Sequence, residues 1–356
     1  MNFFNNTLNF PIPKDDLIHI MDNTTDLWES LRGQSIFITG GSGFVGTWLL
    51  ESLLQANDLF LLEVSIVILT QDPINFLVTS PHIAGHRAVT LLGGDMVNFE
   101  YPKGIFPFVL HIATRISFSP QVLQSAEELD LELEGTRRIL DFAYSHGVRK
   151  FLFTSSGAVY GKQPLDLSHV SEDYPGAPFS FDPNSGYGQT KRFSEFMCTL
   201  YGQKHNFDAM IARLFTFIGP VLPLNSNYAV GNFIGDTLHG RTVRIVGDGT
   251  PYRSYLYAAD LAIWLWNILL KGKPAYPYNV GSNCAVSIAD LANKVVAEVA
   301  PGVGVDILGA PLLGAPSQRY VPCTKRAEVE LGLKVLIPLS DGIRRTVAWH
   351  RACKTY

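Results

Sequence analysis

The chain has 356 residues, of which 47% are apolar and 17% charged, and its 28 basic and 32 acidic residues give a formal net charge of −4. A charged fraction below the roughly 25% of typical soluble proteins argues against a largely disordered chain. The mildly acidic charge leaves no electrostatic footprint for nucleic acid. The most apolar windows, residues 59–69 and 261–270, are shorter than the roughly 18 residues that a membrane span requires, so no membrane association is expected.

The cysteines and the N-terminus indicate the compartment. The four cysteines are far apart and match neither a zinc-ligand pattern nor a dense disulfide framework, so we expect no metal site and a reducing environment: Cys198, Cys284, Cys323 and Cys353. The first residues lack the basic start, apolar segment and cleavage site of a secretory signal. The sequence therefore predicts a cytoplasmic protein.

Residues 1–34 precede the first clear strand and are interpreted as an N-terminal extension. Within them, the amphipathic stretch 15–31 carries apolar side chains that can cover a neighbouring surface: Leu17, Ile20, Met21 and Trp28. We expect this extension to pack against the rest of the protein.

Apolar runs alternate with helical patterns over the next part of the chain. The runs that predict strands are residues 35–39, 64–70, 88–92, 107–113 and 150–154, and helical periodicity follows at 44–55 and 121–145. This order predicts an α/β fold: a Rossmann-like, doubly wound parallel sheet over residues 35–215. From residue 216 to 356 the pattern is irregular, with glycine- and proline-rich joints, and we expect a smaller C-terminal α/β lobe interwoven with the core.

Three glycines stand between the first predicted strand and its helix, at the spacing G-x-x-G-x-x-G: Gly40, Gly43 and Gly46. In a strand–turn–helix context, such glycines permit a tight turn, a close approach of the backbone to a pyrophosphate and close packing of helix on strand. The backbone amides at the helix start, at Phe44 and Val45, then face the anion. The turn predicts a dinucleotide site.

The end of the second predicted strand indicates which dinucleotide is bound. A carboxylate there selects the ribose of NAD, whereas an arginine favours NADP. The strand ends in Gln71 and Asp72, with no arginine beside them. Asp72 can hold ribose hydroxyls or simply cap the turn before Pro73, so NAD is favoured over NADP.

A tyrosine and a lysine lie four residues apart at the start of a later predicted helix. Tyr187 and Lys191 therefore share one helix face, and an ammonium one turn away is expected to lower the phenol's pKa toward physiological pH. Tyr187 is the candidate general acid and base. Ser156, at the end of the strand that begins at residue 150, is expected at the carboxyl edge of the sheet, where it can orient a substrate hydroxyl or carbonyl.

With these features in place, residues 33–335 resemble the extended short-chain dehydrogenase/reductases, specifically their nucleotide-sugar epimerase/dehydratase group. The motifs that carry the resemblance are TGGSGFVG (39–46), GGD (93–95), HIAT (111–114), SSGAVYG (155–161), YGQTK (187–191), ARLFTFIGP (212–220), GDGTPYRSYLYAADLA (247–262) and YNVGS (278–282). The resemblance implies a nucleotide-diphosphate sugar as substrate, bound by the lobe of residues 216–356.

The resemblance also assigns roles to single residues. It places Asp95 near the adenine, Ala113 in the cofactor site and Lys191 at the nicotinamide ribose, and it gives Tyr187 and Ser156 the reacting sugar hydroxyl.

The same resemblance implies contacts to the nucleotide diphosphate from Arg253, Asn227 and Arg319. A guanidinium in a glycine-rich loop, as at Arg253, suits a diphosphate on physical grounds as well. Helices 121–145 and 187–201 correspond to those that pair in homodimers of this group, although burial within one chain explains their apolar residues equally well.

Two residues after Ser156 limit which reaction of this group is expected. In the 4,6-dehydratases of the group, an Asp-Glu pair directly follows the catalytic Ser or Thr and eliminates water, and the related decarboxylases usually carry a Glu at the second position. Here Gly157 and Ala158 stand there, and neither can move a proton. An epimerase needs no second acid/base pair. The sequence therefore favours an NAD-dependent epimerase, acting at C4 through a transient 4-keto sugar, with a dehydratase or uronate decarboxylase as alternatives.

Other readings stay open. Thr216 replaces an asparagine common in related epimerases, so the sugar pocket differs there. Glu172 and Asp173 are acid/base candidates from another direction, or solvated turn residues. An NADPH-dependent 4-keto-sugar reductase is a further alternative, as is a dinucleotide sensor without turnover, although an intact Ser156, Tyr187 and Lys191 set argues against the sensor.

Overall fold

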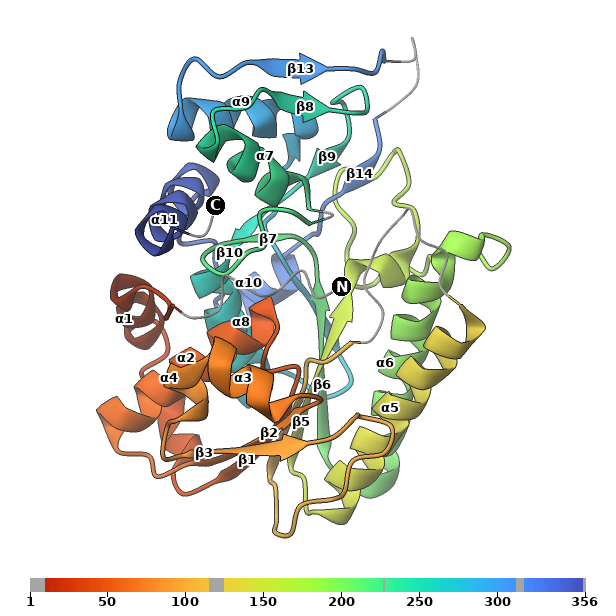
Figure 1. The fold of residues 1–356 in the computed structure, drawn as a ribbon. Coiled ribbons are helices and arrows are strands. Elements are labelled where there is room, and N and C mark those ends of the chain that lie inside the picture. The colour runs from red at the N-terminus through yellow and green to blue at the C-terminus, as the bar shows by residue number, and fades with distance from the viewer. Residues whose placement is uncertain (1–9, 115–124, 227, 312–316, 355–356) are drawn as a thin grey trace.

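A seven-stranded parallel sheet forms the centre of the protein (Figure 1), whose computed structural model describes residues 10–114, 125–226, 228–311 and 317–354. The strand order is β11-β6-β5-β4-β1-β2-β3, and every neighbouring pair is parallel. These strands are β1 (Ser35–Thr39), β2 (Ser65–Thr70), β3 (Val89–Gly93), β4 (Phe108–His111), β5 (Lys150–Ser156), β6 (Asp208–Leu214) and β11 (Pro277–Val280). The predicted doubly wound parallel sheet is confirmed.

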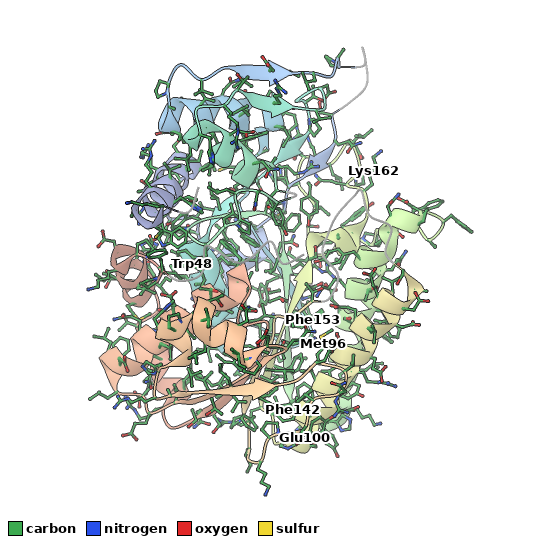
Figure 2. The ribbon with its side chains drawn as sticks, in the orientation of Figure 1. Trp48, Met96, Glu100, Phe142, Phe153 and Lys162 are labelled. Atoms are coloured by element: carbon green, nitrogen blue, oxygen red, sulfur yellow. The ribbon has the colours of Figure 1, made fainter. Side chains whose placement is uncertain are left out.

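Alternating side chains of β1 divide the core into two clusters, one on each face of the sheet. Ile36 and Ile38 join the cluster beneath α2 (Phe44–Phe60) and α8 (Ala258–Lys271), whereas Phe37 joins the cluster beneath α5 (Ala126–Ser145) and α6 (Gly186–His205). Figure 2 labels Trp48 of the first cluster and Met96, Phe142 and Phe153 of the second. Helices on both faces bury the central strands, whereas the edge strand β3 stays partly exposed.

The first described residues pack against the sheet domain. They form α1 (Lys14–Asp22) and the short helix η1 (Trp28–Leu31), and α1 contacts α2 and α8. The apolar side chains singled out in the sequence, Leu17, Ile20, Met21 and Trp28, are buried. The buried carboxylate of Asp16 accepts hydrogen bonds from the Tyr257 hydroxyl (2.6 Å) and from Arg345 (2.7 Å), which ties α1 to residues far along the chain.

A smaller α/β lobe stands above the carboxyl edge of the sheet (Figure 1). It is built from α7 (Ala229–Leu238), β8 (Val243–Ile245), β9 (Tyr252–Arg253), β12 (Val286–Ser287), α9 (Ile288–Val299), β13 (Val305–Ile307) and β14 (Arg319–Tyr320). The lobe and the core are interwoven, since β11 returns to the large sheet between β9 and β12 in the chain. The domain boundaries at residues 34/35 and 215/216 stay predictions.

The remaining elements connect the lobe with the core or cover the edges of the sheet. They are α3 (Pro73–Thr79), α4 (Pro81–Ala84), η2 (Gly157–Tyr160), η3 (Pro183–Ser185), β7 (Phe217–Ile218), β10 (Leu256–Tyr257), α10 (Lys325–Leu331) and α11 (Leu339–Cys353). In the described part of the chain, none of the helices has both the length and the apolar character needed to span a bilayer.

Candidate active site

The glycine turn lies where the sheet order reverses, between β1 and its neighbours β4 and β2. Gly40 has a φ of +76°, and a Cβ atom at Gly46 would collide with the carbonyl oxygen of Gly40. The turn feeds directly into α2, whose N-cap is Gly43 in an extended conformation. The first-turn amides, including those of Phe44 and Val45, have no intrahelical acceptor and carry the positive end of the helix dipole. This backbone cradle, closed to side chains, fits the pyrophosphate of a dinucleotide.

Polar side chains meet next to this cradle at the ends of β2 and β3. Gln71 Nε2 donates to Asp95 Oδ2 at 2.7 Å, and the other Asp95 oxygen accepts from the Val97 amide at 3.1 Å. Asp72 is the N-cap of α3 and accepts from the Asn75 amide at 2.8 Å. Asp72 therefore has a structural role whether or not it also holds a ribose.

On the opposite side of the cradle, β1 and β4 approach each other closely. The Ala113 amide donates to Thr39 Oγ1 at 3.1 Å, and a Cβ atom at Gly40 would lie 2.5 Å from the Ala113 nitrogen. The backbone of Ala113 therefore lies directly against the glycine turn, and its contact with a cofactor stays a prediction.

The three predicted catalytic side chains come together at the carboxyl end of β5. Ser156 is the last residue of β5, and its hydroxyl accepts from the Ala158 amide at 3.1 Å. Tyr187, in the first turn of α6, is hydrogen-bonded to Ser156. One turn later, Lys191 Nζ donates to the Thr154 carbonyl oxygen at 3.4 Å. The arrangement joins a phenol, a hydroxyl and an ammonium in one small region.

Lys191 has a partner that the sequence reading missed. Glu132 of α5 places Oε1 3.3 Å from Lys191 Nζ, and the two side chains are 1% and 3% exposed. A buried ammonium and carboxylate stabilise each other only in close contact of this kind. The sequence does contain a signal for the burial of Glu132. It shares one face of the helix with Gly135, Thr136 and Ile139, whose side chains are small or apolar enough to be buried.

The pKa of Tyr187 differs from the sequence-based expectation. Burial is the largest influence on it and raises it above its ordinary value, the Ser156 hydrogen bond lowers it, and the Tyr228 hydroxyl and Glu132 raise it further. The predicted lowering of the Tyr187 pKa by Lys191 is therefore wrong. The physical reason is that Tyr187 is desolvated while the ammonium of Lys191 is paired with a carboxylate.

A second phenol lies beside Ser156. Tyr320 of β14 is hydrogen-bonded to Ser156, and its ring packs on Phe215 with centroids 4.7 Å apart. A Cβ atom at Gly157 would lie 2.7 Å from Tyr320 Oη and 2.7 Å from Phe215 Cζ. Tyr320 and Phe215 thus occupy the space that a side chain at position 157 needs.

The small sheet β12-β9-β14 separates the two predicted diphosphate-binding arginines. Arg253 pairs in register with Tyr320, and its guanidinium lies 5.9 Å from the centroid of that ring. Arg319 pairs with Tyr252 and stacks on it at 4.2 Å. Since adjacent strand residues face opposite sides, Arg253 shares the face of Tyr320 and Arg319 lies on the other face. Asn227, the third residue of this set, lies outside the described residues.

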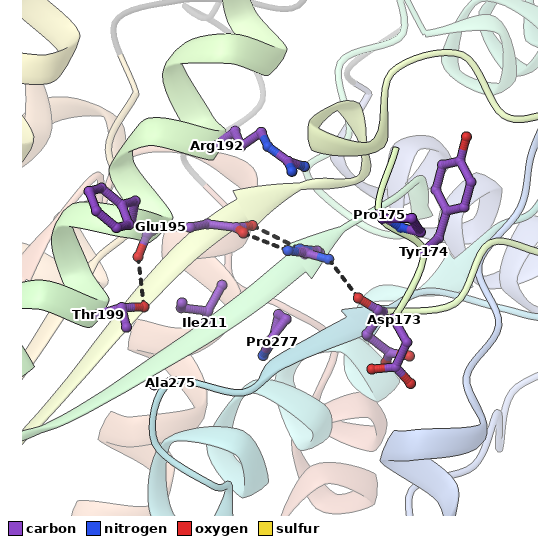
Figure 3. A pocket seen from close by; sticks show the side chains of 12 residues that line it. Asp173, Tyr174, Pro175, Arg192, Glu195, Thr199, Ile211, Ala275 and Pro277 are labelled. Atoms are coloured by element: carbon purple, nitrogen blue, oxygen red, sulfur yellow. Dashed lines mark hydrogen bonds and ion pairs between the residues drawn. The ribbon is translucent and has the colours of Figure 1, made fainter. Parts of the chain in front are cut away.

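A cavity of about 420 Å³ lies on the other side of α6, against β6 and residues 275–277 (Figure 3). Two of its charged groups pair with each other: Arg213 makes hydrogen bonds of 2.9 and 2.7 Å to the carboxylate of Glu195, and a third of 3.4 Å to the backbone carbonyl oxygen of Glu172. Glu195 also accepts a hydrogen bond from the Ser155 hydroxyl at 2.6 Å. The cluster of Arg213, Glu195 and Glu172 is thus attached to the end of β5 through Ser155.

The two acid/base candidates of the loop before α6 belong to this cluster. The Glu172 carboxylate accepts from the Asn279 amide at 2.9 Å, and Asp173 pairs with Arg326 at 2.5 Å. Burial raises the pKa of Glu172. Both carboxylates hold the loop in place, on the side of α6 away from Ser156.

Comparison with known proteins agrees with this architecture. Residues 36–281 match the model of a family described as the NAD dependent epimerase/dehydratase family. The chain belongs to this family. Among the curated relatives of this family member is UDP-glucuronic acid decarboxylase 1 of Xenopus tropicalis, 28% identical over 320 residues, which cover 89% of this chain and 72% of the relative.

Solved structures share the fold at lower identity. DesIV, a dTDP-glucose 4,6-dehydratase of Streptomyces venezuelae solved with NAD bound, has a TM-score of 0.76 at 21% identity, covering 90% of this chain and 97% of DesIV. A UDP-glucose 4-epimerase of Thermotoga maritima has a TM-score of 0.72 at 20% identity, covering 90% and 99%. A decarboxylase, a dehydratase and an epimerase are thus all similar to this family member, which leaves its reaction to be argued from its own residues.

Proposed function

We propose that this family member is an NAD-dependent nucleotide-sugar epimerase that works through a transient 4-keto sugar. The observation that carries the proposal is at Gly157 and Ala158. The position of the dehydratase aspartate is a glycine whose side-chain space is filled by Tyr320 and Phe215, and the next position is an alanine. Without acid/base groups at these two positions, elimination of water across C5 and C6 has no proton carrier there.

The remaining groups suffice for epimerisation. Tyr187 accepts the proton of the sugar hydroxyl and later returns it, Ser156 holds that oxygen by a hydrogen bond, and Lys191 supplies positive charge beside the phenol. NAD, when bound, supplies reversible hydride transfer. The glycine turn, Asp95 and Ala113 are the residues of this chain that would hold it, and the backbone cradle at Gly40 and Gly46 supports that fit. The lack of a basic residue beside Gln71 and Asp72 favours NAD over NADP.

Arg253 is the residue best placed to hold the diphosphate of the substrate. It shares a face with Tyr320, which contacts Ser156, and it forms no carboxylate ion pair with the described residues. A guanidinium in this position can bind a diphosphate while the sugar reaches Ser156 and Tyr187. Arg319, on the other face of the small sheet, stays a predicted contact, as does Asn227.

The deciding experiment is an incubation of the purified protein with UDP-, dTDP-, CDP- and GDP-sugars without added cofactor. We expect a product isomeric with one substrate, since an epimerase returns its hydride and needs no net oxidant. A product lighter by one water would identify a dehydratase, and release of carbon dioxide from a uronate would identify a decarboxylase. Turnover that requires added NADPH would identify a reductase, and binding of dinucleotide without any turnover would identify a sensor.

We also infer that the protein forms a homodimer through α5 and α6. These helices contact each other and leave apolar side chains on their outer surface: Tyr144, Phe193, Phe196 and Leu200, which are 52%, 50%, 55% and 47% exposed. Phe196→Glu should convert a dimer into a monomer in light scattering coupled to size exclusion. Phe181→Glu, at an 86% exposed phenylalanine outside both helices, is the matched control. A wild-type monomer would contradict the inference.

A further inference from the structure

The buried pair of Glu132 and Lys191 is a departure from a simple tyrosine–lysine site. Glu132 lies on α5 and Lys191 on α6, and the Glu132 residue is completely buried. Glu132 Oε1 lies 3.3 Å from Lys191 Nζ, slightly closer than the Thr154 carbonyl oxygen, which accepts from Nζ at 3.4 Å. The ammonium also stands 5.0 Å from the centroid of the Phe153 ring. The carboxylate is thus the charged group that faces Lys191 most closely.

Two of the elements packed around this pair, β4 and α6, each contribute a group that is uncharged at neutral pH. From β4, His111 bridges Thr39 and Thr136, and burial lowers its pKa to about 3, so its ring is neutral. On α6, burial raises the pKa of Cys198 and keeps its thiol protonated. α6 also carries the Glu195 carboxylate, one turn beyond Lys191, and this charge is paired with Arg213 at 2.7 Å.

The groups that face Tyr187 are likewise mostly neutral. Burial raises the pKa of Tyr228, before α7, and of Tyr320, on β14, so both phenols are protonated. Arg253 acts on Tyr320 rather than on Tyr187 directly. Among these groups, Glu132 raises the pKa of Tyr187 by its negative charge. Within this set, the group with a full charge that acts on Tyr187 is Glu132, whose carboxylate is paired with Lys191.

We propose that Glu132 is a positioning residue of the active site: its carboxylate fixes the Lys191 ammonium against the end of β5 and offsets part of the ammonium's charge at the Tyr187 hydroxyl. The proposal rests on the proposed role of Tyr187 as the acid/base group. It follows that Tyr187 gives up its proton at a higher pH than it would beside an unpaired lysine. The Tyr187 phenolate is then a stronger base toward the sugar hydroxyl, but a smaller fraction of the molecules carries it at a given pH.

The test is Glu132→Gln, which keeps the size and hydrogen-bonding capacity of the side chain and removes its charge. We expect the acidic limb of the pH–rate profile to move to lower pH by about one unit, the lower end of the effect of an unpaired charge within roughly 4–6 Å. The plateau rate should fall, because Lys191 loses its fixed partner. Glu132→Asp should restore most of the wild-type profile. Glu134→Gln, at a surface position of the same helix, should change neither quantity.

A second readout does not depend on sugar turnover. The phenolate of Tyr187 can be titrated by ultraviolet difference absorbance in the protein as purified with its dinucleotide, using Tyr187→Phe to identify its contribution. Glu132→Gln should shift this titration to lower pH in the same direction as the rate. If turnover on every sugar is absent but the phenolate shifts, the proposed function fails and the role of Glu132 stands.

Three results would overturn the proposal. A phenolate titration in Glu132→Gln that is unchanged, or that moves to higher pH, would show that the carboxylate does not act on Tyr187. A pH–rate profile whose height falls with no horizontal shift would assign Glu132 to packing alone. Failure of Glu132→Gln and Glu132→Asn to fold, while Glu132→Asp folds, would assign the carboxylate only to charge burial.

Discussion

Tyr320 Oη lies 2.7 Å from the position that a Cβ atom would take at Gly157, so the phenol and any side chain at residue 157 exclude each other. Tyr320 comes from β14, far along the chain, and it also contacts Ser156. Through this one relationship the smaller lobe determines what the end of β5 can carry. Next to Ser156, the space that a carboxylate at position 157 would need is occupied by the neutral phenol of Tyr320, a residue of the smaller lobe.

Replacing Gly157 with alanine should therefore destabilise the protein and slow its reaction. The added methyl group must displace Tyr320 or Phe215, and overpacking of this kind typically costs about 1–3 kcal/mol. Urea unfolding and the turnover number measure the two effects. Gly247→Ala is the control, because a Cβ atom there would meet nothing within 4 Å. Equal stability of the two variants would contradict the close contact at Gly157.

The same contact limits conversion into a dehydratase. The double variant Gly157→Asp/Ala158→Glu introduces the two missing carboxyl groups, but Tyr320 and Phe215 occupy the aspartate's position. We expect no product lighter by one water when this variant is incubated with the accepted nucleotide sugar. Detection of such a product by mass spectrometry would show that the site can rearrange around the new side chain.

Tyr187→Phe should lower turnover by about 10²–10⁴-fold, the contribution typical of a positioned acid/base group. The ring and its packing are retained, and Ser156 keeps its hydrogen bond from the Ala158 amide. The unfolding midpoint should therefore stay close to that of the wild type. Tyr276→Phe, at a 52% exposed tyrosine, is the matched control for loss of a phenol. Near-normal turnover by Tyr187→Phe would remove it from the acid/base role.

The sequence predicted the strands better than the contacts between them. The run at residues 35–39 is β1 with the same bounds, because a central strand that is buried on both faces leaves a continuous apolar signal. The helix α8 was visible only as an apolar window, since it is buried on nearly all sides and has no polar face to reveal its period. Strands β9 and β14 have two residues each, and nothing local predicts such short pairs.

The candidate site shows the same division. Ser156, Tyr187 and Lys191 were predictable, because strand ends and one-turn spacing place side chains by local geometry. The partners Glu132 and Tyr320 were missed, since each reaches the site from another element through tertiary packing, and only Glu132 left a signal in the sequence. A glutamate on the buried stripe of an amphipathic helix is a sequence signal for such a partner.

Stability should decline as the pH falls below about 6.5, in part because of buried histidines. Burial lowers the pKa of His350 to about 4 in the folded protein, whereas an unfolded histidine has an ordinary value near 6.5. Between these values the unfolded state binds more protons, so protonation favours unfolding and stability is lost as the pH falls. The slope from one such group reaches about 1.4 kcal/mol per pH unit.

Urea unfolding of His350→Gln between pH 4 and 7 measures this contribution. The variant should show a shallower fall in unfolding free energy toward low pH than the wild type, whatever its stability at pH 7. His239→Gln, which replaces an exposed histidine at the end of α7, is the control for the substitution itself. Identical slopes for wild type and His350→Gln would mean that His350 titrates alike in both states.

Two roles are open to Asp72, capping helix α3 and holding the ribose of NAD, and substitutions can separate them. Its carboxylate caps α3 by accepting from the Asn75 amide at 2.8 Å, and it stands at the end of β2, where a carboxylate can also hold the ribose of NAD. Serine caps a helix about as well as aspartate, but it has no charge and accepts ribose hydroxyls less strongly. Asp72→Ser should therefore keep the stability of the cofactor-free protein and weaken NAD binding, whereas Asp72→Ala should lose about 1 kcal/mol of stability as well.

Calorimetric titration with NAD and urea unfolding of both variants measure the two effects. Unchanged NAD affinity in Asp72→Ser would reduce Asp72 to a helix cap and transfer ribose recognition to the neighbouring pair of Gln71 and Asp95.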